Sequence, residues 1–200
     1  MYSNKLKLTT LGTSSTGKTS IVNRFISGQF DHYATTVGAS YLMCFNDDIK
    51  YEIWDTAGNE RFFSLLPLYY RGSDIILLVF DLANLETIDN LTYFLNELSK
   101  NMSTECRIIV VGNKLDLIPD GDSTKANIIV KGLLKDRETP KISDFVYVST
   151  KDGSNFEELK NIVFKHGEEI RLRKEKMGAI TYPLVLTDAE KSDKSKCTYC

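Results

Sequence analysis

The sequence predicts an α/β fold in which helices cover both faces of a mostly parallel sheet. Six short apolar runs alternate with four helical patterns along the chain, the order expected of strands joined by right-handed helical crossovers. Two of these runs, Ile75–Phe80 and Ile108–Val111, are apolar throughout instead of alternating. Continuous apolar strands are typical of a parallel sheet that is buried on both faces.

The first half of the chain contains three predicted strands and one helix. The apolar run Leu6–Leu11 is followed by a glycine-rich turn and by the helical pattern Lys18–Ser27. Two further runs, Ser40–Phe45 and Tyr51–Trp54, flank the polar residues Asn46-Asp47-Asp48. Such a turn between two strand patterns indicates a hairpin, so we expect one antiparallel strand at an edge of the sheet.

The second half repeats the strand–helix alternation three times. The predicted strands are Ile75–Phe80, Arg107–Val111 and Phe145–Val148, and the predicted helices are Glu86–Lys100, Thr124–Arg137 and Asn155–Arg173. Beyond Arg173 the periodic pattern ends and Pro183 and scattered charges follow. We therefore predict a single domain over residues 1–173 and a flexible tail over residues 174–200.

Composition excludes several classes of function. The chain has 200 residues, 42% of them hydrophobic, and a formal net charge of −2. This charge argues against general nucleic-acid binding. No apolar run approaches the roughly 18 residues of a membrane-spanning helix, and the N-terminal residues lack the pattern of a signal peptide. We expect a cytosolic protein, in which Cys44 and Cys106 are buried free thiols and not a disulfide pair.

A phosphate-binding loop is predicted between the first strand and the first helix. Residues Gly12 to Thr19 match G-x-x-x-x-G-K-[ST] in the strand-to-helix context that the motif requires. Backbone N–H groups of this loop and of the helix N-terminus would face phosphates, Lys18 would pair with the β- and γ-phosphates, and Thr19 would ligate Mg²⁺. The alternative is an ordinary glycine-rich turn. The remaining nucleotide-contacting residues expected here are Ser14, Ser15, Thr16, Gly17 and Ser20.

A second segment places a carboxylate, a glycine and an amide at the end of a strand. Asp55 ends the run, Gly58 follows three residues later, and Asn59 comes next. In phosphate-splitting sites these parts serve the metal, the γ-phosphate and the attacking water. A D-x-x-G pattern alone recurs by chance, so its weight depends on the phosphate loop.

A base-reading segment follows the fifth predicted strand. Asp116 in Asn113-Lys114-Leu115-Asp116 could accept two hydrogen bonds from guanine N1 and its exocyclic amine, whereas adenine would leave this carboxylate unpaired. Lys114 can lay its stem along the base. Residues Ser149, Thr150 and Lys151 lie where a backbone N–H could reach the guanine carbonyl oxygen. The alternatives are a strand-end turn for the first segment and a helix-entry loop for the second.

Together these four motifs, in this order, resemble the Ras superfamily over roughly residues 5–172. Finer features are similar to the Rab family of membrane-trafficking GTPases, and within it to the early-endosomal subgroup. The features similar to the Rab family are Trp54-Asp55-Thr56-Ala57-Gly58, Glu60-Arg61-Phe62-Phe63-Ser64, Leu68-Tyr69-Tyr70-Arg71-Gly72 and the cysteine-containing C-terminus. The features similar to the early-endosomal subgroup are Gly28-Gln29-Phe30, Val37-Gly38-Ala39-Ser40-Tyr41 and Ser64–Tyr70.

The resemblance implies a P-loop NTPase fold of three layers, with a six-stranded sheet and two switch loops. It implies that Thr36 ligates Mg²⁺ and senses the γ-phosphate, that Asp55 holds Mg²⁺, and that Gly58 N–H contacts the γ-phosphate. Catalysis would rest on Lys18, Thr36, Gly58 and Asn59, and the bound nucleotide would be GTP or GDP. Tyr41, Trp54 and Tyr69 match an aromatic trio read by effectors, or they simply pack the switch against the sheet.

The chain departs from the family pattern in three ways. Asn59 stands where the family has Gln, and its amide is displaced by about one C–C bond, ~1.5 Å. Because misplacement by about 1 Å can cost on the order of 10²-fold, we expect slow intrinsic hydrolysis, unless Asn substitutes with little effect. Thr150 replaces the usual Ala and could shift its loop and loosen nucleotide. Cys197 and Cys200 are three apart, whereas such chains more often end in adjacent or one-apart cysteines.

The resemblance also implies partners and a location. It implies prenylation of Cys197 and Cys200, with one lipid giving marginal and two giving stable membrane anchoring; unmodified or metal-binding cysteines are the alternative. The expected partners are an exchange factor, a GTPase-activating protein, a GDP-dissociation inhibitor or escort protein, and effectors, with the protein otherwise a monomer. We expect reversible attachment to the cytosolic face of an endomembrane, the endosomal one first.

Two other functions fit parts of the sequence. A GTP-binding interaction module with negligible hydrolysis would explain Asn59 together with the crowding that Ser14 and Ser15 impose beside the γ-phosphate. A small-molecule kinase would need an acceptor site and would leave Asn113–Asp116 unexplained. Nucleotide preference and single-turnover hydrolysis discriminate among these three.

Overall fold

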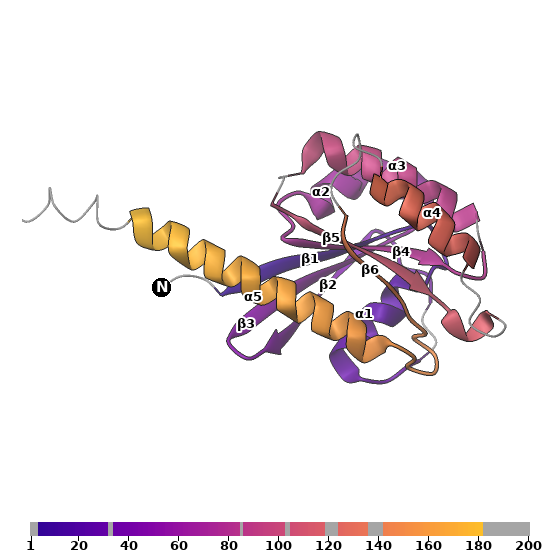
Figure 1. The fold of residues 1–200 in the computed structure, drawn as a ribbon, viewed down its shortest axis with the longest axis horizontal. Coiled ribbons are helices and arrows are strands. Elements are labelled where there is room, and N and C mark those ends of the chain that lie inside the picture. Colours follow the sequence, from indigo (N-terminus) through magenta and orange to yellow (C-terminus); the bar gives the residue numbers. More distant parts are fainter. Residues whose placement is uncertain are drawn as a thin grey trace, which may run out of the picture.

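Six strands form one sheet in the order β2-β3-β1-β4-β5-β6 (Figure 1). The computed structural model describes residues 4–31, 34–84, 86–102, 105–118, 124–135 and 142–181. The strands are β1 (Lys5–Leu11), β2 (Ala39–Asn46), β3 (Ile49–Thr56), β4 (Ile75–Asp81), β5 (Arg107–Asn113) and β6 (Ile142–Tyr147).

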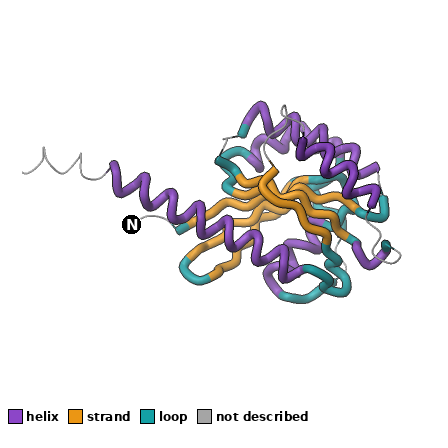
Figure 2. The backbone as a smooth tube through the Cα atoms, viewed as in Figure 1, coloured by secondary structure: helices purple, strands orange, loops and turns teal. Residues whose placement is uncertain are grey.

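The sheet is parallel except at one edge. β1 pairs in parallel with both β3 and β4, and β4-β5-β6 continue in the same direction. β2 is antiparallel to β3, and Asp47 at their turn adopts a left-handed φ of 49°. The predicted antiparallel edge strand is therefore confirmed, as is the α/β class. The carboxyl ends of the parallel strands consequently meet at one end of the sheet, where loops connect them to the next elements (Figure 2).

Helices cover both faces of the sheet. α1 (Lys18–Ser27) and α5 (Phe156–Thr181) lie on one face, and α2 (Leu66–Tyr70), α3 (Glu86–Asn101) and α4 (Thr124–Lys135) lie on the other (Figure 1). Alternate residues of β4 serve the two cores: Ile75 and Leu77 belong to the first, whereas Ile76 and Leu78 belong to the second. This division explains why the β4 sequence is apolar throughout.

Several boundaries differ from the prediction. β6 begins at Ile142 and ends at Tyr147, whereas the predicted strand began at Phe145. The short helices η1 (Glu60–Leu65), α2 and η2 (Leu115–Leu117) were not predicted, because helices of three to six residues show too few turns for a periodic pattern.

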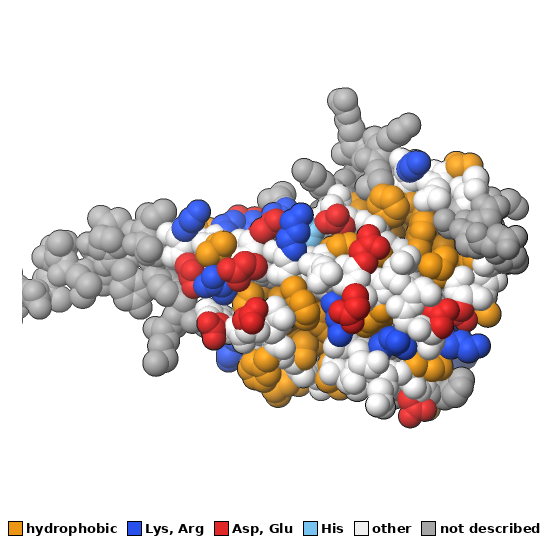
Figure 3. Space-filling view, turned by 60° about the horizontal axis from the view of Figure 1, so that its bottom comes forward, with side chains coloured by type: hydrophobic (Ala, Val, Ile, Leu, Met, Phe, Trp, Pro, Cys, Tyr) orange, Lys and Arg blue, Asp and Glu red, His pale blue; other side chains and the backbone are white. Residues whose placement is uncertain are grey.

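The last helix runs to Thr181, so its predicted end at Arg173 is wrong. Polar contacts, which leave no apolar period, accompany the extra turns: Arg171 pairs with Glu168 and Glu175, and Lys174 Nζ lies 2.6 Å from Asp74 Oδ1. Acidic and basic side chains consequently intermingle along α5 in the space-filling view (Figure 3). The division into a domain and a tail stays a prediction, since residues 182–200 lie outside the described structure.

Within the described ranges, no helix is both long and apolar enough to cross a membrane.

Candidate functional site

The loop between β1 and α1 has a backbone that requires glycine at both ends. Gly12 has φ 144°, and a Cβ there would lie 2.1 Å from Val79 O. Gly17 has φ 91°, and its Cβ would lie 2.2 Å from Asn113 Nδ2. Gly17 is also the N-cap of α1 and supplies no side-chain acceptor. The first N–H groups of α1 are therefore available to an anion at the helix N-terminus.

Two further features shape this loop. Thr16 Oγ1 donates a hydrogen bond to Thr13 O at 3.1 Å and so closes the turn. Ser15 adopts a left-handed φ of 63°, a conformation that costs an L-residue energy and is common at ligand-binding turns. The loop's own contacts thus help to fix its conformation.

Lys18 lies under the loop with its ammonium directed at backbone carbonyls. Its Nζ donates to Gly12 O at 2.9 Å and to Thr13 O at 2.8 Å, and the residue is 5% exposed. Burial lowers the pKa of Lys18 to about 8, against the opposing effect of Asp55. A bound anion would favour the charged form of this amine, so the position suits a phosphate partner.

Three oxygen-bearing side chains meet beside Lys18. Thr19 Oγ1 lies 2.6 Å from Asp55 Oδ2 and 2.8 Å from Thr36 Oγ1, and Thr36 Oγ1 lies 3.4 Å from Asp55 Oδ2. Asp55 is fully buried, and its other oxygen accepts a hydrogen bond from Thr10 Oγ1 at 3.0 Å. Burial raises the pKa of Asp55, while hydrogen bonds from Thr19 and Thr10 lower it. The structure thus brings all three predicted metal-binding residues together.

This donor set fits Mg²⁺. It differs from a site built of three or more His, Cys, Asp or Glu side chains, and the described residues contain no site of that kind. Two hydroxyls and one carboxylate are hard oxygen donors, and Mg²⁺ typically combines one or two carboxylates with water and substrate phosphates. A cation bound here would also neutralise the buried Asp55 carboxylate.

The segment after β3 packs tightly on the phosphate loop. A Cβ on Gly58 would lie 2.4 Å from both Lys18 Nζ and Thr13 O, so this contact admits only glycine. Ala57 N–H donates to Gly38 O at 2.7 Å, which joins this segment to the loop before β2. Both loops that carry predicted switch residues are therefore in direct contact.

Asn59 caps the short helix η1. Its Oδ1 accepts a hydrogen bond from Arg61 N–H at 3.0 Å, and its backbone carbonyl accepts one from Phe62 N–H at 2.9 Å. A short Asn side chain suits this local contact, which Gln is less able to make. The amide oxygen of Asn59 is consequently engaged within its own segment.

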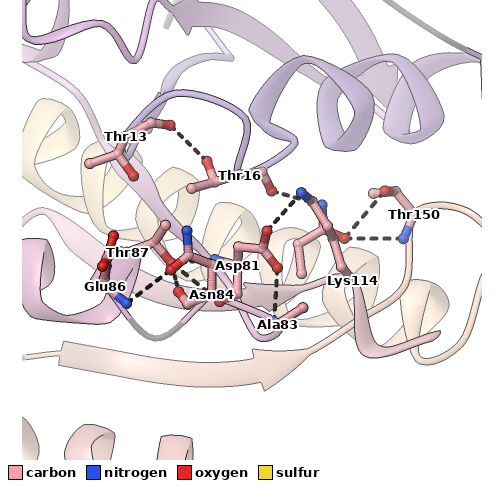
Figure 4. Close-up of polar contacts among 10 residues, drawn as sticks. Thr13, Thr16, Asp81, Ala83, Asn84, Glu86, Thr87, Lys114 and Thr150 are labelled. Atoms are coloured by element: carbon pink, nitrogen blue, oxygen red, sulfur yellow. Dashed lines mark hydrogen bonds and ion pairs between the residues drawn. The ribbon is translucent and has the colours of Figure 1, made fainter. Parts of the chain in front are cut away.

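The predicted base-reading residues make several polar contacts, and Figure 4 draws those around Thr16, Lys114 and Thr150. Asn113 Nδ2 donates to Thr16 O at 2.9 Å, and Asn113 Oδ1 accepts from both the N–H and the hydroxyl of Thr150 at 3.2 Å. Ser149 Oγ donates to Asp116 Oδ1 at 2.6 Å. Lys114 Nζ lies 2.7 Å from Asp81 Oδ2. Asp81 was not predicted, since a strand-end carboxylate carries no motif.

A cavity of about 360 Å³ joins the two ends of this site. Most of the predicted nucleotide-binding and metal-binding residues line it, whereas Gly12, Thr16, Asp55 and Ser149 do not. Six further lining residues were not predicted as site residues. The predicted lining residues are Ser14, Ser15, Gly17, Lys18, Thr19, Ser20, Thr36, Gly58, Asn113, Lys114, Asp116, Thr150 and Lys151; the six others are Phe30, Asp31, Ala34, Thr35, Thr56 and Leu117.

The aromatic trio forms a contiguous cluster near the site. The ring centroids of Tyr41 and Trp54 are 5.4 Å apart, and those of Trp54 and Tyr69 are 6.0 Å apart. Lys7 Nζ lies 5.3 Å from the centre of the Trp54 ring. Tyr41 is 45% exposed, so packing and an exposed contact surface coexist here. Cys197 and Cys200 lie outside the described residues.

The chain was compared with models of known protein families. The model described as the Ras family matches residues 7–168. The matched region contains the phosphate loop, the Asp55–Gly58 segment and the base-reading network.

Proposed function

The chain belongs to the Ras family of small GTPases, which act as GTP-binding switches, and we propose that it is a switch of the Rab type with slow intrinsic hydrolysis. The observation that carries the nucleotide assignment is the cavity whose phosphate end is lined by Lys18 and Thr19 and whose base end is lined by Asp116 and Thr150. The Rab assignment rests on the sequence motifs around Trp54 and on the cluster that Trp54 forms with Tyr41 and Tyr69.

Each group would serve the reaction by position and charge, because phosphoryl transfer requires little covalent chemistry from the protein. Lys18 would leave its carbonyl partners for the β- and γ-phosphates, and the free N–H groups of α1 would bind the same oxygens. Thr19, Thr36 and Asp55 would hold Mg²⁺. The bound ion would stabilise charge on the phosphate oxygens. Gly58 N–H would donate a hydrogen bond to the γ-phosphate and so couple its presence to the position of the η1 segment.

Slow hydrolysis is supported by the engagement of Asn59. Its amide oxygen accepts the Arg61 N–H bond that caps η1, and its side chain is one carbon shorter than Gln. An Asn held in this cap would orient water poorly. A water misplaced by about 1 Å lowers a rate on the order of 10²-fold.

Single-turnover hydrolysis of GTP by wild type and Asn59→Gln tests this proposal. We expect Asn59→Gln to hydrolyse GTP up to about 10²-fold faster than wild type, because a longer amide reaches the water position. Asn59→Ala is the matched control, and it should be no faster than wild type. Equal rates for wild type and Asn59→Gln would refute the proposed role of Asn59.

A GTP-binding interaction module with negligible hydrolysis is the second candidate. Ser14 and Ser15 line the cavity, and their side chains would narrow the space beside the γ-phosphate, which favours this candidate. Adding cell extract to the single-turnover assay separates the two. Acceleration by a GTPase-activating protein is expected for a switch, whereas turnover that stays at background supports the module.

We further propose attachment to an endosomal or other endomembrane through lipids on Cys197 and Cys200. Ras-family GTPases interact with exchange factors, GTPase-activating proteins and effectors; a GDP-dissociation inhibitor or escort protein is proposed here in addition. Two lipids would anchor stably and one only marginally. The intact mass of protein isolated from its native cytosol and membranes tests this, and a mass without prenyl groups would contradict it.

A further inference from the structure

Arg24, in the last turn of α1, contacts the loop that carries Thr150. Its Nη1 donates a hydrogen bond to Thr150 O at 2.7 Å and lies 3.4 Å from Lys151 O. The guanidinium also lies over the ring of Phe156, 5.5 Å from its centre. A charged donor bonded to two successive carbonyls fixes the direction of the peptide between them.

The loop is shaped to receive this guanidinium. Gly153 has φ 91°, and a Cβ there would lie 2.4 Å from Arg24 Nη2 and 3.3 Å from Arg24 Cζ. Gly153 N–H donates to Ser149 O at 3.0 Å, which closes the turn around the Arg24 side chain. The absence of a side chain at position 153 therefore makes room for the guanidinium.

The bond to Thr150 acts on the candidate base site. Thr150 is 4% exposed and lines the nucleotide cavity, and its N–H points to Asn113 Oδ1 at 3.2 Å. The carbonyl of the same residue is the one that Arg24 binds. Arg24 thus holds the peptide unit that directly follows this N–H, and a shift of the loop would move the donor that guanine O6 would share with Asn113 Oδ1.

The same helix also holds the phosphate loop. α1 begins at Lys18 and reaches Arg24 after six residues, a rise of about 9 Å. Its first residues contact the phosphate end of the cavity, and its last turn holds the base end. One rigid element thus connects the two ends of the nucleotide site.

We propose that Arg24 is a positioning residue that orients Thr150 toward the 6-oxo group of guanine and thereby slows nucleotide release. Arg24 touches the recognition loop and not the nucleotide cavity itself. The inference rests on the proposed guanine-nucleotide site and assigns to α1 a role in base recognition.

Nucleotide release from the full chain tests the proposal. Release of fluorescent GDP and of its 6-thio analogue is measured with Mg²⁺ for wild type, Arg24→Ala and Arg24→Lys, with Arg171→Ala as control. Arg171 pairs with Glu168 and Glu175 on α5, away from the residues that line the cavity. Loss of one charge-assisted hydrogen bond should make GDP release from Arg24→Ala about 10-fold faster, while the control stays within about 2-fold of wild type.

The 6-thio analogue separates positioning from general loosening. Its sulfur is a weaker acceptor than oxygen at the position that Thr150 N–H would read. In Arg24→Ala a misdirected N–H would distinguish oxygen from sulfur less well. The release rate of the 6-thio analogue divided by that of GDP should therefore be lower in Arg24→Ala than in wild type. Arg24→Lys should restore part of the ratio, since an ammonium can reach one carbonyl but cannot reproduce the planar guanidinium contact. An unchanged ratio, or unchanged GDP release, would overturn the inference.

Gly153→Ala provides a second variant that retains Arg24. Its added Cβ would displace the guanidinium, so it should change release in the same direction as Arg24→Ala. If wild type retained neither nucleotide, the proposed function itself would be refuted. If wild type retained both and Arg24→Ala released them as wild type does, only the role of Arg24 would be refuted.

Discussion

Thr150 carries a hydroxyl that strengthens the network around the candidate base site. The hydroxyl and the backbone N–H of Thr150 both donate to Asn113 Oδ1 at 3.2 Å, and Asn113 in turn donates to Thr16 O. The sequence suggested that a β-branched residue here could loosen nucleotide. The geometry favours the opposite effect, because the hydroxyl adds a buried bond between the base-reading segment and its neighbouring loop.

We therefore expect Thr150→Ala to release GDP faster. A neutral hydrogen bond contributes about 0.5–1.5 kcal/mol, which corresponds to an increase of roughly 2- to 12-fold if the bond serves the bound state. The measurement is displacement of fluorescent GDP by excess unlabelled GDP. Thr150→Val keeps the shape of the side chain and should behave like Thr150→Ala; slower release from either variant would support the loosening effect.

Cys44 and Cys106 are free thiols as predicted, but they are only partly buried. Their ionisation tests how far this partial burial protects them. Burial raises the pKa of Cys44 to about 11 and that of Cys106 to about 12. At pH 8 a thiol with a pKa of about 11 is ~0.1% ionised, compared with roughly a quarter for an exposed thiol of pKa about 8.5. We expect both to react slowly with iodoacetamide at pH 8, as measured by mass spectrometry of their peptides.

The same shifts predict how stability depends on pH. A raised folded-state pKa means that the neutral thiol is favoured by folding, so its contribution is complete below the unfolded pKa of about 8.5 and falls as the pH rises above it. Midpoints of urea unfolding should therefore decrease between pH 8.5 and 11. Cys44→Ala and Cys106→Ala should each reduce this slope, and rapid labelling of the native wild type would contradict the burial that underlies it.

At the scale of elements, apolar periodicity predicted the helices that pack an apolar face against the sheet. Helix α1 begins and ends as predicted, because its apolar residues Ile21, Val22 and Phe25 repeat on one face and glycines adjoin both ends. η1 could not be predicted, since it depends on the Asn59 cap and buries no residue. The end of α5 was missed for a related reason: ion pairs such as that of Lys174 with Asp74 join residues 100 positions apart, and no local pattern reveals them.

In the candidate site too, local patterns were predictable from the sequence and long-range contacts were not. Motif residues such as Lys18 and Asp116 were predicted because a fixed spacing places them on the loops after β1 and β5. Arg24 and Asp81 act on those residues from other elements, through contacts that exist only once the sheet has formed. Spacing along the chain therefore identifies direct contacts with a ligand but not the residues that support them.

The contact between α5 and β3 offers a test of packing between elements. Tyr51 on β3 is fully buried, and its hydroxyl has no hydrogen-bond partner among the described residues. It faces Gly167 on α5, where a Cβ would lie 2.0 Å from Tyr51 Oη. The helix thus approaches the sheet closely because position 167 has no side chain.

We expect Tyr51→Phe to be stabilising and Gly167→Ala to be destabilising. Removing an unsatisfied buried hydroxyl should gain about 1–3 kcal/mol, and overpacking the contact should cost about 1–3 kcal/mol. Urea unfolding of the two single variants and of their combination measures both effects. In the double variant the cost of Gly167→Ala should be smaller, since the hydroxyl that the added methyl group meets is gone; strictly additive effects would show that the two residues do not share this contact.

At the scale of the whole molecule, the nucleotide cavity and the aromatic cluster lie next to the same loops. The loops after the parallel strands form the nucleotide cavity, and the hydrogen bond from Ala57 to Gly38 joins the two loops that would respond to the γ-phosphate. The aromatic cluster spans three elements that meet beside those loops. Trp54 on β3 contacts Tyr41 on β2 and Tyr69 on α2. A shift of either loop should therefore change the surroundings of Trp54.

Trp54 is the only tryptophan in the chain, so tryptophan fluorescence reports this cluster alone. We expect the emission of the GDP-bound protein to differ from that of protein bound to a non-hydrolysable GTP analogue with Mg²⁺, because release of the switch loops alters the contacts of Tyr69 and Tyr41 with the indole. Removing Mg²⁺ with EDTA should reduce the difference. Tyr69→Leu should weaken the response while leaving GDP binding unchanged, since Tyr69 does not line the nucleotide cavity. Identical spectra in both nucleotide states would mean that the cluster is only packing, and the surface proposed to meet effectors would then lose its link to the switch.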